Sequence, residues 1–283
     1  RPTNKRTTMK FFTTLSLLFL LPSLLLSQEV MKKDDYTFTL EQQQLCTEVK
    51  NQQRTGTCWS FSTVSFLESE MMRQGRPAVD LSDMFAVWHT YMDKARRYVR
   101  YHGKANFSEG SLAHDVMNVL QRHGMAPEAA YDGLPEGVTG YDHSRLVKEL
   151  SAYLDEVIQS PPLPPDWEEK VAAILNEQLG AIPETFTYEG RTYTPRTFAD
   201  EVVRINPEDY LSLTSFTHHP WYSSFILEVP DNYSDGYFYN LPLDELMEVT
   251  NHALENGFTI EWDGDVSEKG FSAANGLAIL PDK

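Results

Sequence analysis

The chain has 283 residues, which is enough for one large domain or two modest domains with a sizeable core. Its 41 acidic side chains outnumber its 24 Lys and Arg side chains, and the formal net charge is -17. This balance disfavours nucleic acid and anionic membrane surfaces as partners. The two cysteines, Cys46 and Cys58, are too few for a disulfide framework, and no Cys/His spacing is typical of structural zinc.

The N-terminus has the composition of a processing segment. Basic residues precede a short apolar run at residues 11–27, which predicts a secretory signal peptide over residues 1–28. Met9 is a natural start, so residues 1–8 are interpreted as upstream read-through. An uncleaved anchor is the alternative, although the run is short for a membrane span. We expect an exported protein, periplasmic or secreted, that has no membrane contact after the signal peptide is removed.

Residues 29–283 are predicted to form one domain, and helices dominate its first half. The chain up to residue 57 is a polar, extended lead-in. Apolar side chains then recur at helical spacing, and Gly75 ends the first run. Similar patterns predict four further helices. The expected helices lie at residues 59–74, 81–101, 112–122 and 144–158, and in a stretch that ends at about residue 179.

Strands become frequent in the second half of the chain. Residues 185–194 alternate around Glu189 and Gly190, which predicts a hairpin. Thr194 and Pro195 then suit the N-cap and first position of a helix. Further strands are expected at 225–229, 236–239 and 258–266, and a helix at 243–255. Helices followed by strands indicate an α+β fold with segregated lobes.

Cys58 stands at the start of the first predicted helix. A thiol is a good nucleophile only as a thiolate, and the free N–H groups and dipole of a helix N-terminus favour a negative sulfur. The Cys58 N–H can also donate to a developing oxyanion. Gln52 lies six residues upstream, with Gly56 between them, so its amide could reach the same oxyanion. These residues alone leave open whether Cys58 is catalytic or packs beside Trp59 as a buried cysteine.

The segment at 49–62, VKNQQRTGTCWSFS, resembles the active-site segment of papain-family cysteine peptidases. The resemblance implies Cys58 as the nucleophile and Gln52 as an oxyanion-hole donor. Thr55 stands where many papain relatives have a disulfide cysteine, and the absence of that cysteine is typical of the bleomycin hydrolase and aminopeptidase C branch. Segments 81–107, 106–128 and 255–272 are also similar to that branch, and the similarity covers about residues 36–283.

The resemblance implies a papain-like α+β fold. A helical lobe would carry Cys58 on its central helix and face a partial, strand-rich lobe across a cleft. The implied reaction is hydrolysis of peptide bonds through a Cys58 thioester by a cysteine peptidase that acts as an aminopeptidase. Peptides are the implied partners, no metal or cofactor is implied, and full-length members of this family often form homo-oligomers.

The family also suggests substrate-binding residues before the third helix. A Gly-Gly pair there offers backbone hydrogen bonds to the bound peptide, and Gly110-Ser111 takes that place here. Ser111 departs from the pattern and could narrow the subsite. Glu109 has two interpretations: it could meet the ammonium group of an aminopeptidase substrate, or it could be a carboxylate that stabilises the start of a helix.

A cysteine peptidase also needs an imidazole base and an Asn or Asp that orients it. The chain has eight histidines, and none stands in a setting like that of the family base. His218 and His219 follow Cys58 by about 160 residues, but the branch has its base after the segment similar to 255–272. We therefore expect a C-terminally truncated, inactive fragment. The alternative is a catalytically silent, exported papain-like binding protein.

Overall fold

The computed structural model describes residues 32–33, 36–37, 39–267, 270–273 and 276–278, in two units. In the first unit, residues 1–41, strands β1 (Lys32–Lys33) and β2 (Tyr36–Thr37) pair in antiparallel fashion. The predicted signal peptide lies outside the described residues. Of the helices that are described, none combines the length and apolar character that a membrane crossing needs.

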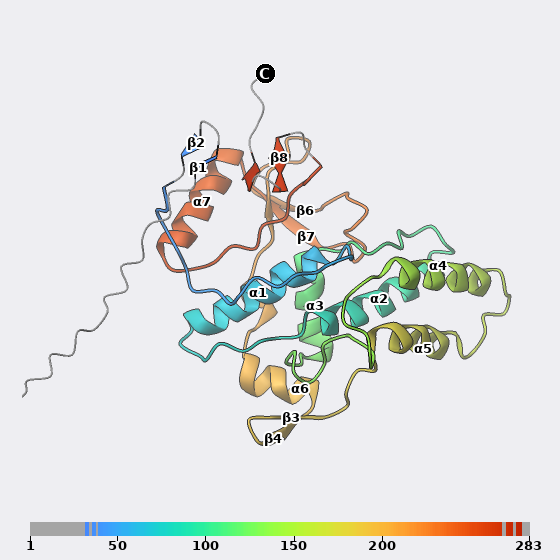
Figure 1. The fold of residues 1–283 in the computed structure, drawn as a ribbon. Coiled ribbons are helices and arrows are strands. Elements are labelled where there is room, and N and C mark those ends of the chain that lie inside the picture. Colours follow the sequence, from blue (N-terminus) through green and yellow to red (C-terminus); the bar gives the residue numbers. More distant parts are fainter. Residues whose placement is uncertain (1–31, 34–35, 38, 268–269, 274–275, 279–283) are drawn as a thin grey trace, which may run out of the picture. The chain divides into compact units, whose positions relative to one another are not determined.

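Five helices occupy the first half of the second unit, residues 42–283, as the sequence predicted (Figure 1). Helix α1 packs against α2 and α3, and α2 also packs against α4 and α5. Apolar side chains from all five helices form one buried core, because each helix has an apolar face at helical spacing. The helices are α1 (Cys58–Arg73), α2 (Asp83–Arg100), α3 (Ala113–His123), α4 (Ser144–Ile158) and α5 (Trp167–Leu179).

The predicted hairpin is confirmed as β3 (Phe186–Tyr188) and β4 (Arg191–Tyr193). Glu189 and Gly190 both have positive φ, 48° and 77°, which a two-residue turn of this kind requires. Thr194 then caps α6 (Pro195–Phe198), with its hydroxyl accepting from the Thr197 N–H. The chain continues through a π-helix, η1 (Ala199–Val203), and a 3-10 turn, η2 (Pro207–Asp209).

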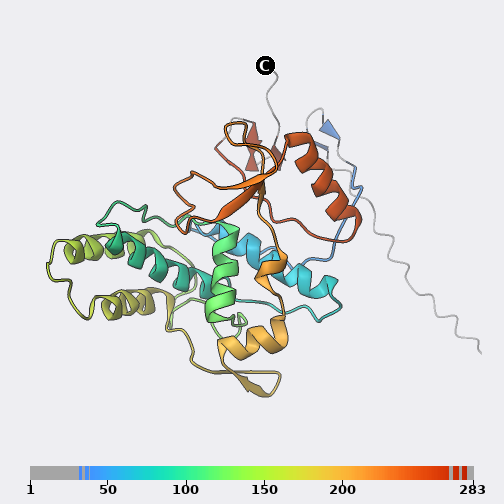
Figure 2. The same cartoon turned by 180° about the vertical axis from the view of Figure 1, so that it is seen from behind.

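The second half of the unit holds a three-stranded sheet of order β5-β7-β6. Strand β7 (Tyr237–Asn240) lies between β5 (Leu213–Thr214), which is parallel to it, and β6 (Ser223–Ile226), which is antiparallel. Helix α7 (Leu243–Glu255) follows, with the predicted bounds. A small antiparallel pair consists of β8 (Phe271–Ser272) and β9 (Leu277–Ala278). Figure 2 shows β6 and β7 in orange and α7 in red, away from α4 and α5.

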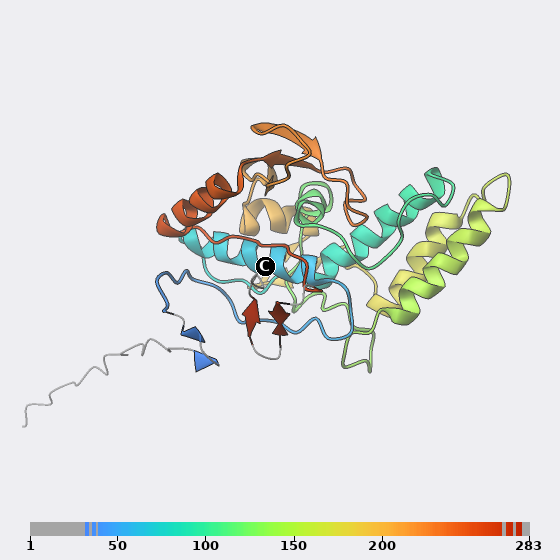
Figure 3. The same ribbon diagram turned by 90° about the horizontal axis from the view of Figure 1, so that it is seen from above.

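The prediction of a strand at 258–266 is wrong. Residues 258–265 form no regular structure and instead follow α1 (Figure 3). The Arg73 guanidinium lies 3.9 Å from the Phe258 ring centroid, near the C-terminal end of α1. The Ser62 hydroxyl donates to Glu261 at 2.9 Å, near its N-terminal end. The alternating side chains therefore contact a helix rather than one face of a sheet, and the segment reaches the start of α1.

Candidate active site

Cys58 is the first residue of α1, and its side chain is exposed. The helix begins there because the Thr57 carbonyl accepts from the backbone N–H groups of Ser60 and Phe61, at 2.9 and 3.3 Å. The backbone N–H groups of Cys58 and Trp59 have no intrahelical acceptor, and both act on the Cys58 thiol. Trp59, in contrast, is buried. The interpretation of Cys58 as a buried packing residue therefore has no support in the structure.

Trp59 fixes the first turn of α1 to the segment that precedes α3. Its indole Nε1 donates to the Glu109 carbonyl at 3.0 Å. One residue later, the buried Ser60 hydroxyl donates to the Asp83 carbonyl at the start of α2, at 2.7 Å. The aromatic and hydroxyl residues that follow Cys58 thus hold its helix end in place, which is why this sequence presents the thiol at a defined position.

The surroundings of Cys58 raise the pKa of its thiol above the ordinary value. Partial desolvation is the largest cause, and the carboxylates of Asp263 and Asp231 add to it. The backbone N–H groups of Trp59 and Cys58 lower the pKa, as expected at a helix N-terminus, but they do not compensate. No histidine of the described residues is among the groups that shift this pKa.

Gln52 belongs to a closed turn, residues 52–57, which we call the Gln52 turn. The Gln52 amide Nε2 donates to the Thr55 carbonyl at 2.7 Å, and the Thr55 hydroxyl donates back to the Gln52 carbonyl at 3.0 Å. The Thr55 and Thr57 hydroxyls lie 2.6 Å apart. Thr55 thus links the turn through hydrogen bonds. A primary amide has two N–H donors, so Gln52 keeps a second donor for an oxyanion.

Lys50, two residues before the Gln52 turn, attaches the chain there to the start of α2. Its ammonium donates to the Leu81 carbonyl at 2.7 Å and to the Asp83 carboxylate at 3.0 Å, and it lies 2.7 Å from Asp80. Burial lowers the pKa of Lys50, but its acidic partners, which include Glu68, raise it by more. Burial raises the pKa of Asp83 to about 7, although Lys50 opposes this effect. No pattern in the sequence indicated a role for Lys50, although it stands in the same segment as Gln52.

The predicted substrate residues lie close to α1, in an arrangement that the sequence did not indicate. The Glu109 carboxylate accepts from the Gly56 N–H at 2.5 Å, so it holds the Gln52 turn. It is not in the first turn of α3, where the acidic residue is Asp115. Ser111 is buried, and its hydroxyl donates to Asp115 at 2.6 Å rather than facing a ligand.

Position 110 requires glycine because the Asp231 carboxylate lies against it. A Cβ atom at this position would come within 2.3 Å of Asp231 Oδ2. The Gly110 carbonyl accepts from the buried Lys94 ammonium at 2.5 Å, and the Ser108 carbonyl accepts from it at 2.7 Å. Lys94 therefore fixes the segment for which the sequence resemblance predicts peptide binding. Its position on the apolar face of α2 was the sequence feature that could have identified it.

Two acidic groups from loops distant in sequence act on the thiol. Asp231 comes from the loop between β6 and β7, and Asp263 from the segment along α1. Burial raises the pKa of Asp263, and Asp231 raises it further. Burial likewise raises the pKa of Glu261, with Asp263 as a further cause. The negative charge of Asp231 and Asp263 near Cys58 suits a cationic group of a ligand.

All eight histidines lie within the described residues, and none is hydrogen-bonded to Cys58. His218 and His219 contact Glu228 instead. His114 is within 2.9 Å of the Ser234 hydroxyl, and the buried His143 is 3.2 Å from the Tyr91 hydroxyl. The described chain therefore supplies a thiol and oxyanion donors at α1 without an imidazole beside them.

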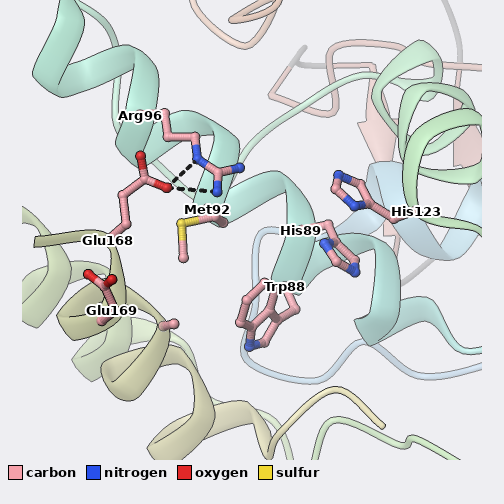
Figure 4. A pocket seen from close by; sticks show the side chains of 8 residues that line it. Trp88, His89, Met92, Arg96, His123, Glu168 and Glu169 are labelled. Carbon is pink, nitrogen blue, oxygen red and sulfur yellow. Dashed lines mark hydrogen bonds and ion pairs between the residues drawn. The ribbon is translucent and has the colours of Figure 1, made fainter. Parts of the chain in front are cut away.

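A pocket between α2, α3 and α5 is not part of this arrangement (Figure 4). The His89 and His123 rings stack there, with centroids 4.0 Å apart. Burial lowers the pKa of His89 to about 3, so this imidazole is neutral. Arg96 is already paired with Glu168 at 2.8 Å. The pocket offers neither a free cation nor a nucleophile, and Cys58 does not line it.

Comparisons with known proteins agree with the arrangement at α1. Residues 35–144 match the family described as "Papain family cysteine protease". The chain is 21% identical over 272 residues to Aminopeptidase G, and 22% identical over 296 residues to Aminopeptidase W, both of Lactobacillus delbrueckii subsp. lactis. It is 21% identical over 243 residues to Cysteine proteinase 1, mitochondrial, of Saccharomyces cerevisiae.

These alignments cover more of this chain than of the relatives. They include 77%, 89% and 70% of this chain, but 59%, 66% and 50% of the three relatives. The chain thus spans between half and two thirds of the length of these proteins. Among solved structures, that of pepw from Lactobacillus rhamnosis HN001 is similar, with a TM-score of 0.64 and 17% identity over 78% of this chain and 59% of that chain.

The structural match confirms the predicted papain-like α+β fold. The thiol at the start of α1, the papain-family match over residues 35–144 and the similarity to these three proteins are consistent with the aminopeptidase C and bleomycin hydrolase branch of the papain-family cysteine peptidases.

Proposed function

We propose that Cys58 is the nucleophile of a cysteine peptidase that removes residues from the N-termini of peptides. The observation that carries this proposal is the exposed Cys58 thiol on the first residue of α1, among backbone N–H groups and beside the Gln52 turn. The names of the bacterial relatives support aminopeptidase action.

In the proposed reaction, Cys58 Sγ bonds to the carbonyl carbon of the scissile peptide bond. The Cys58 N–H and the second N–H of Gln52 donate to the oxyanion that forms. Collapse of this intermediate breaks the C–N bond, and the amine leaves with a proton, so that a thioester remains on Cys58. Water then hydrolyses the thioester and restores the thiol.

This sequence of steps needs a base that takes the thiol proton and gives it to the leaving amine. None of the eight histidines is placed to do so. We propose that the imidazole comes from outside these 283 residues, and that the chain by itself does not hydrolyse peptides. Export through the segment at 11–27 and homo-oligomer formation by the complete protein stay predictions.

The acidic groups near Cys58 support a substrate with a positive charge. Asp231 and Asp263 both act on the thiol, and Asp231 lies against Gly110, where the family binds the peptide backbone. A free N-terminal ammonium would balance their charge. These two aspartates are better placed for that task than Glu109, whose carboxylate already accepts from Gly56.

A second candidate function is binding without catalysis. The raised pKa of the Cys58 thiol and the lack of an imidazole among the described groups that act on it favour this alternative. The coding sequence after Lys283 discriminates the two. A histidine followed by an Asn-Ser-Trp segment there supports the peptidase, whereas a stop codon directly after Lys283 supports the binding protein.

The protein expressed from its natural gene tests the role of Cys58. We expect release of the chromophore from aminoacyl p-nitroanilides, and no release after Cys58→Ala. Gln52→Ala should lower kcat by about 100- to 1000-fold, because one oxyanion donor is lost. Cys46→Ala, which removes the other exposed thiol, is the matched control and should leave kcat unchanged. Activity that survives Cys58→Ala would contradict the proposal.

A further inference from the structure

Two histidines and one glutamate lie close together on the surface near β6. They have no role in the proposed reaction. His219 Nε2 lies 2.9 and 3.1 Å from the two Glu228 carboxylate oxygens. His218 Nε2 lies 3.4 Å from Glu228 Oε2. One ligand atom from each of the three residues lies within 4.8 Å of the other two. The side chains are half-buried or exposed, so an ion from solvent can reach them.

These spacings suit a small transition-metal ion. Zinc binds imidazole nitrogen and carboxylate oxygen at about 2.0–2.2 Å, so neighbouring ligands of a tetrahedral site lie roughly 3.3 Å apart. The observed separations of 2.9 to 3.4 Å between the imidazoles and the carboxylate are close to that value. Two imidazoles with one carboxylate favour zinc, nickel or copper over calcium or magnesium, which prefer oxygen ligands.

The loop that carries the two histidines is held in place by a buried asparagine. Asn240 on β7 donates from Nδ2 to the carbonyls of Phe216 and His219, at 2.9 and 3.1 Å. Its Oδ1 accepts from the Phe216 N–H at 2.8 Å. The His219 ring also stacks on Phe225 of β6, with centroids 3.8 Å apart and an angle of 17°. The His219 side chain, and the loop backbone that carries His218, are thus positioned before any ion binds.

We propose that His218, His219 and Glu228 bind one divalent transition-metal ion of the zinc type, with water in the remaining position. The bound ion would join the loop at 216–220 to the end of β6. This site does not depend on the peptidase proposal. Nothing in the sequence indicated this metal site, because Glu228 is separated from the two histidines along the chain. Only the fold of β6 and the loop before it brings Glu228 back to them.

Calorimetric titration of the metal-free protein with Zn²⁺ tests the site. The titration uses a Cys46→Ser/Cys58→Ser background, since both free thiols would compete for zinc. We expect one equivalent to bind. His219→Ala and Glu228→Gln should each weaken binding at least about tenfold, as loss of one of three protein ligands predicts. His252→Ala, on α7, is the matched control and should bind as the background does.

Cobalt gives a second readout that does not depend on heat. Co²⁺ bound to two imidazoles and a carboxylate should show d–d absorption, and this absorption should be lost in the Glu228→Gln variant, whose fold is checked by circular dichroism. Absence of stoichiometric Zn²⁺ binding would overturn the proposal. Binding that is unchanged in both His219→Ala and Glu228→Gln would overturn it as well.

Discussion

Lys50→Met should lower the free energy of unfolding by about 3–5 kcal/mol, the cost of leaving buried charges without their partner. The side chains of Glu68 and Asp83 are 0% and 3% exposed, and the Lys50 ammonium lies 3.6 and 3.0 Å from them. Methionine preserves most of the side-chain length but removes the cation. The Leu81 carbonyl also loses its donor. Urea unfolding at pH 7.5 measures the change.

The pH dependence of this loss gives a second check. Burial already raises the pKa of Asp83 to about 7, and removal of Lys50 should raise it further, since Lys50 is the cation that lowers it. A carboxyl whose folded pKa is raised supports the fold below its unfolded pKa and costs stability as the pH rises. The deficit of Lys50→Met should therefore shrink from pH 7.5 to pH 5.

Lys148→Met is the matched control for Lys50→Met. Lys148 is exposed on α4, and its loss should change the free energy of unfolding by no more than about 0.5 kcal/mol. Equal stability of Lys50→Met and the wild-type protein would show that Lys50 does not stabilise the buried carboxylates of Glu68 and Asp83. A loss of stability in Lys50→Met that grows as the pH falls would contradict the prediction as well.

Lys94→Met should cost about 2–4 kcal/mol and loosen the segment at 106–111. Lys94 donates two charged hydrogen bonds, to the carbonyls of Ser108 and Gly110, and each such bond contributes about 1.5–3 kcal/mol. Burial of the ammonium is unfavourable and lowers the pKa of Lys94 to about 8. Because Lys94→Met removes this unfavourable burial, the net loss of stability is smaller than the two hydrogen bonds alone would give. Asp231 would lose its nearby cation as well.

Hydrogen exchange separates the local effect of Lys94→Met from its effect on global stability. Amides at 106–111 should exchange faster under conditions in which α5 stays protected. Lys104→Met, at an exposed position after α2, is the control and should alter neither quantity. Unchanged exchange at 106–111 in a folded Lys94→Met protein would show that other contacts fix this segment.

Local patterns predicted most of the helices. The apolar stripes and end residues of α1, α4 and α7 gave their bounds to within one or two residues, because capping and periodicity are properties of neighbouring residues. The hairpin at Glu189-Gly190 followed for the same reason. The extended segment at 258–266 was mistaken for a strand because its alternation does not reveal whether it contacts a sheet or a helix.

The candidate site was only partly predictable. Cys58 and Gln52 could be found because their segment is continuous in sequence. The contact of Glu109 with Gly56, and the positions of Asp231 and Asp263 near the thiol, depend on loops that only the folded chain brings together. The buried positions of Lys50 and Lys94 depend on distant acceptors in the same way.

The most direct test of the account is the pH dependence of Cys58 alkylation in the 283-residue chain. We have proposed that Cys58 is a papain-type nucleophile whose imidazole partner is not among the eight histidines. Reaction with iodoacetamide, followed by mass spectrometry with the exposed Cys46 as reference, gives the rate at each pH. We predict one titration, with its midpoint above the ordinary thiol pKa and lowered by Asp263→Asn. Rapid labelling that persists below pH 6 would contradict the account, since it would reveal a thiolate–imidazolium pair within this chain.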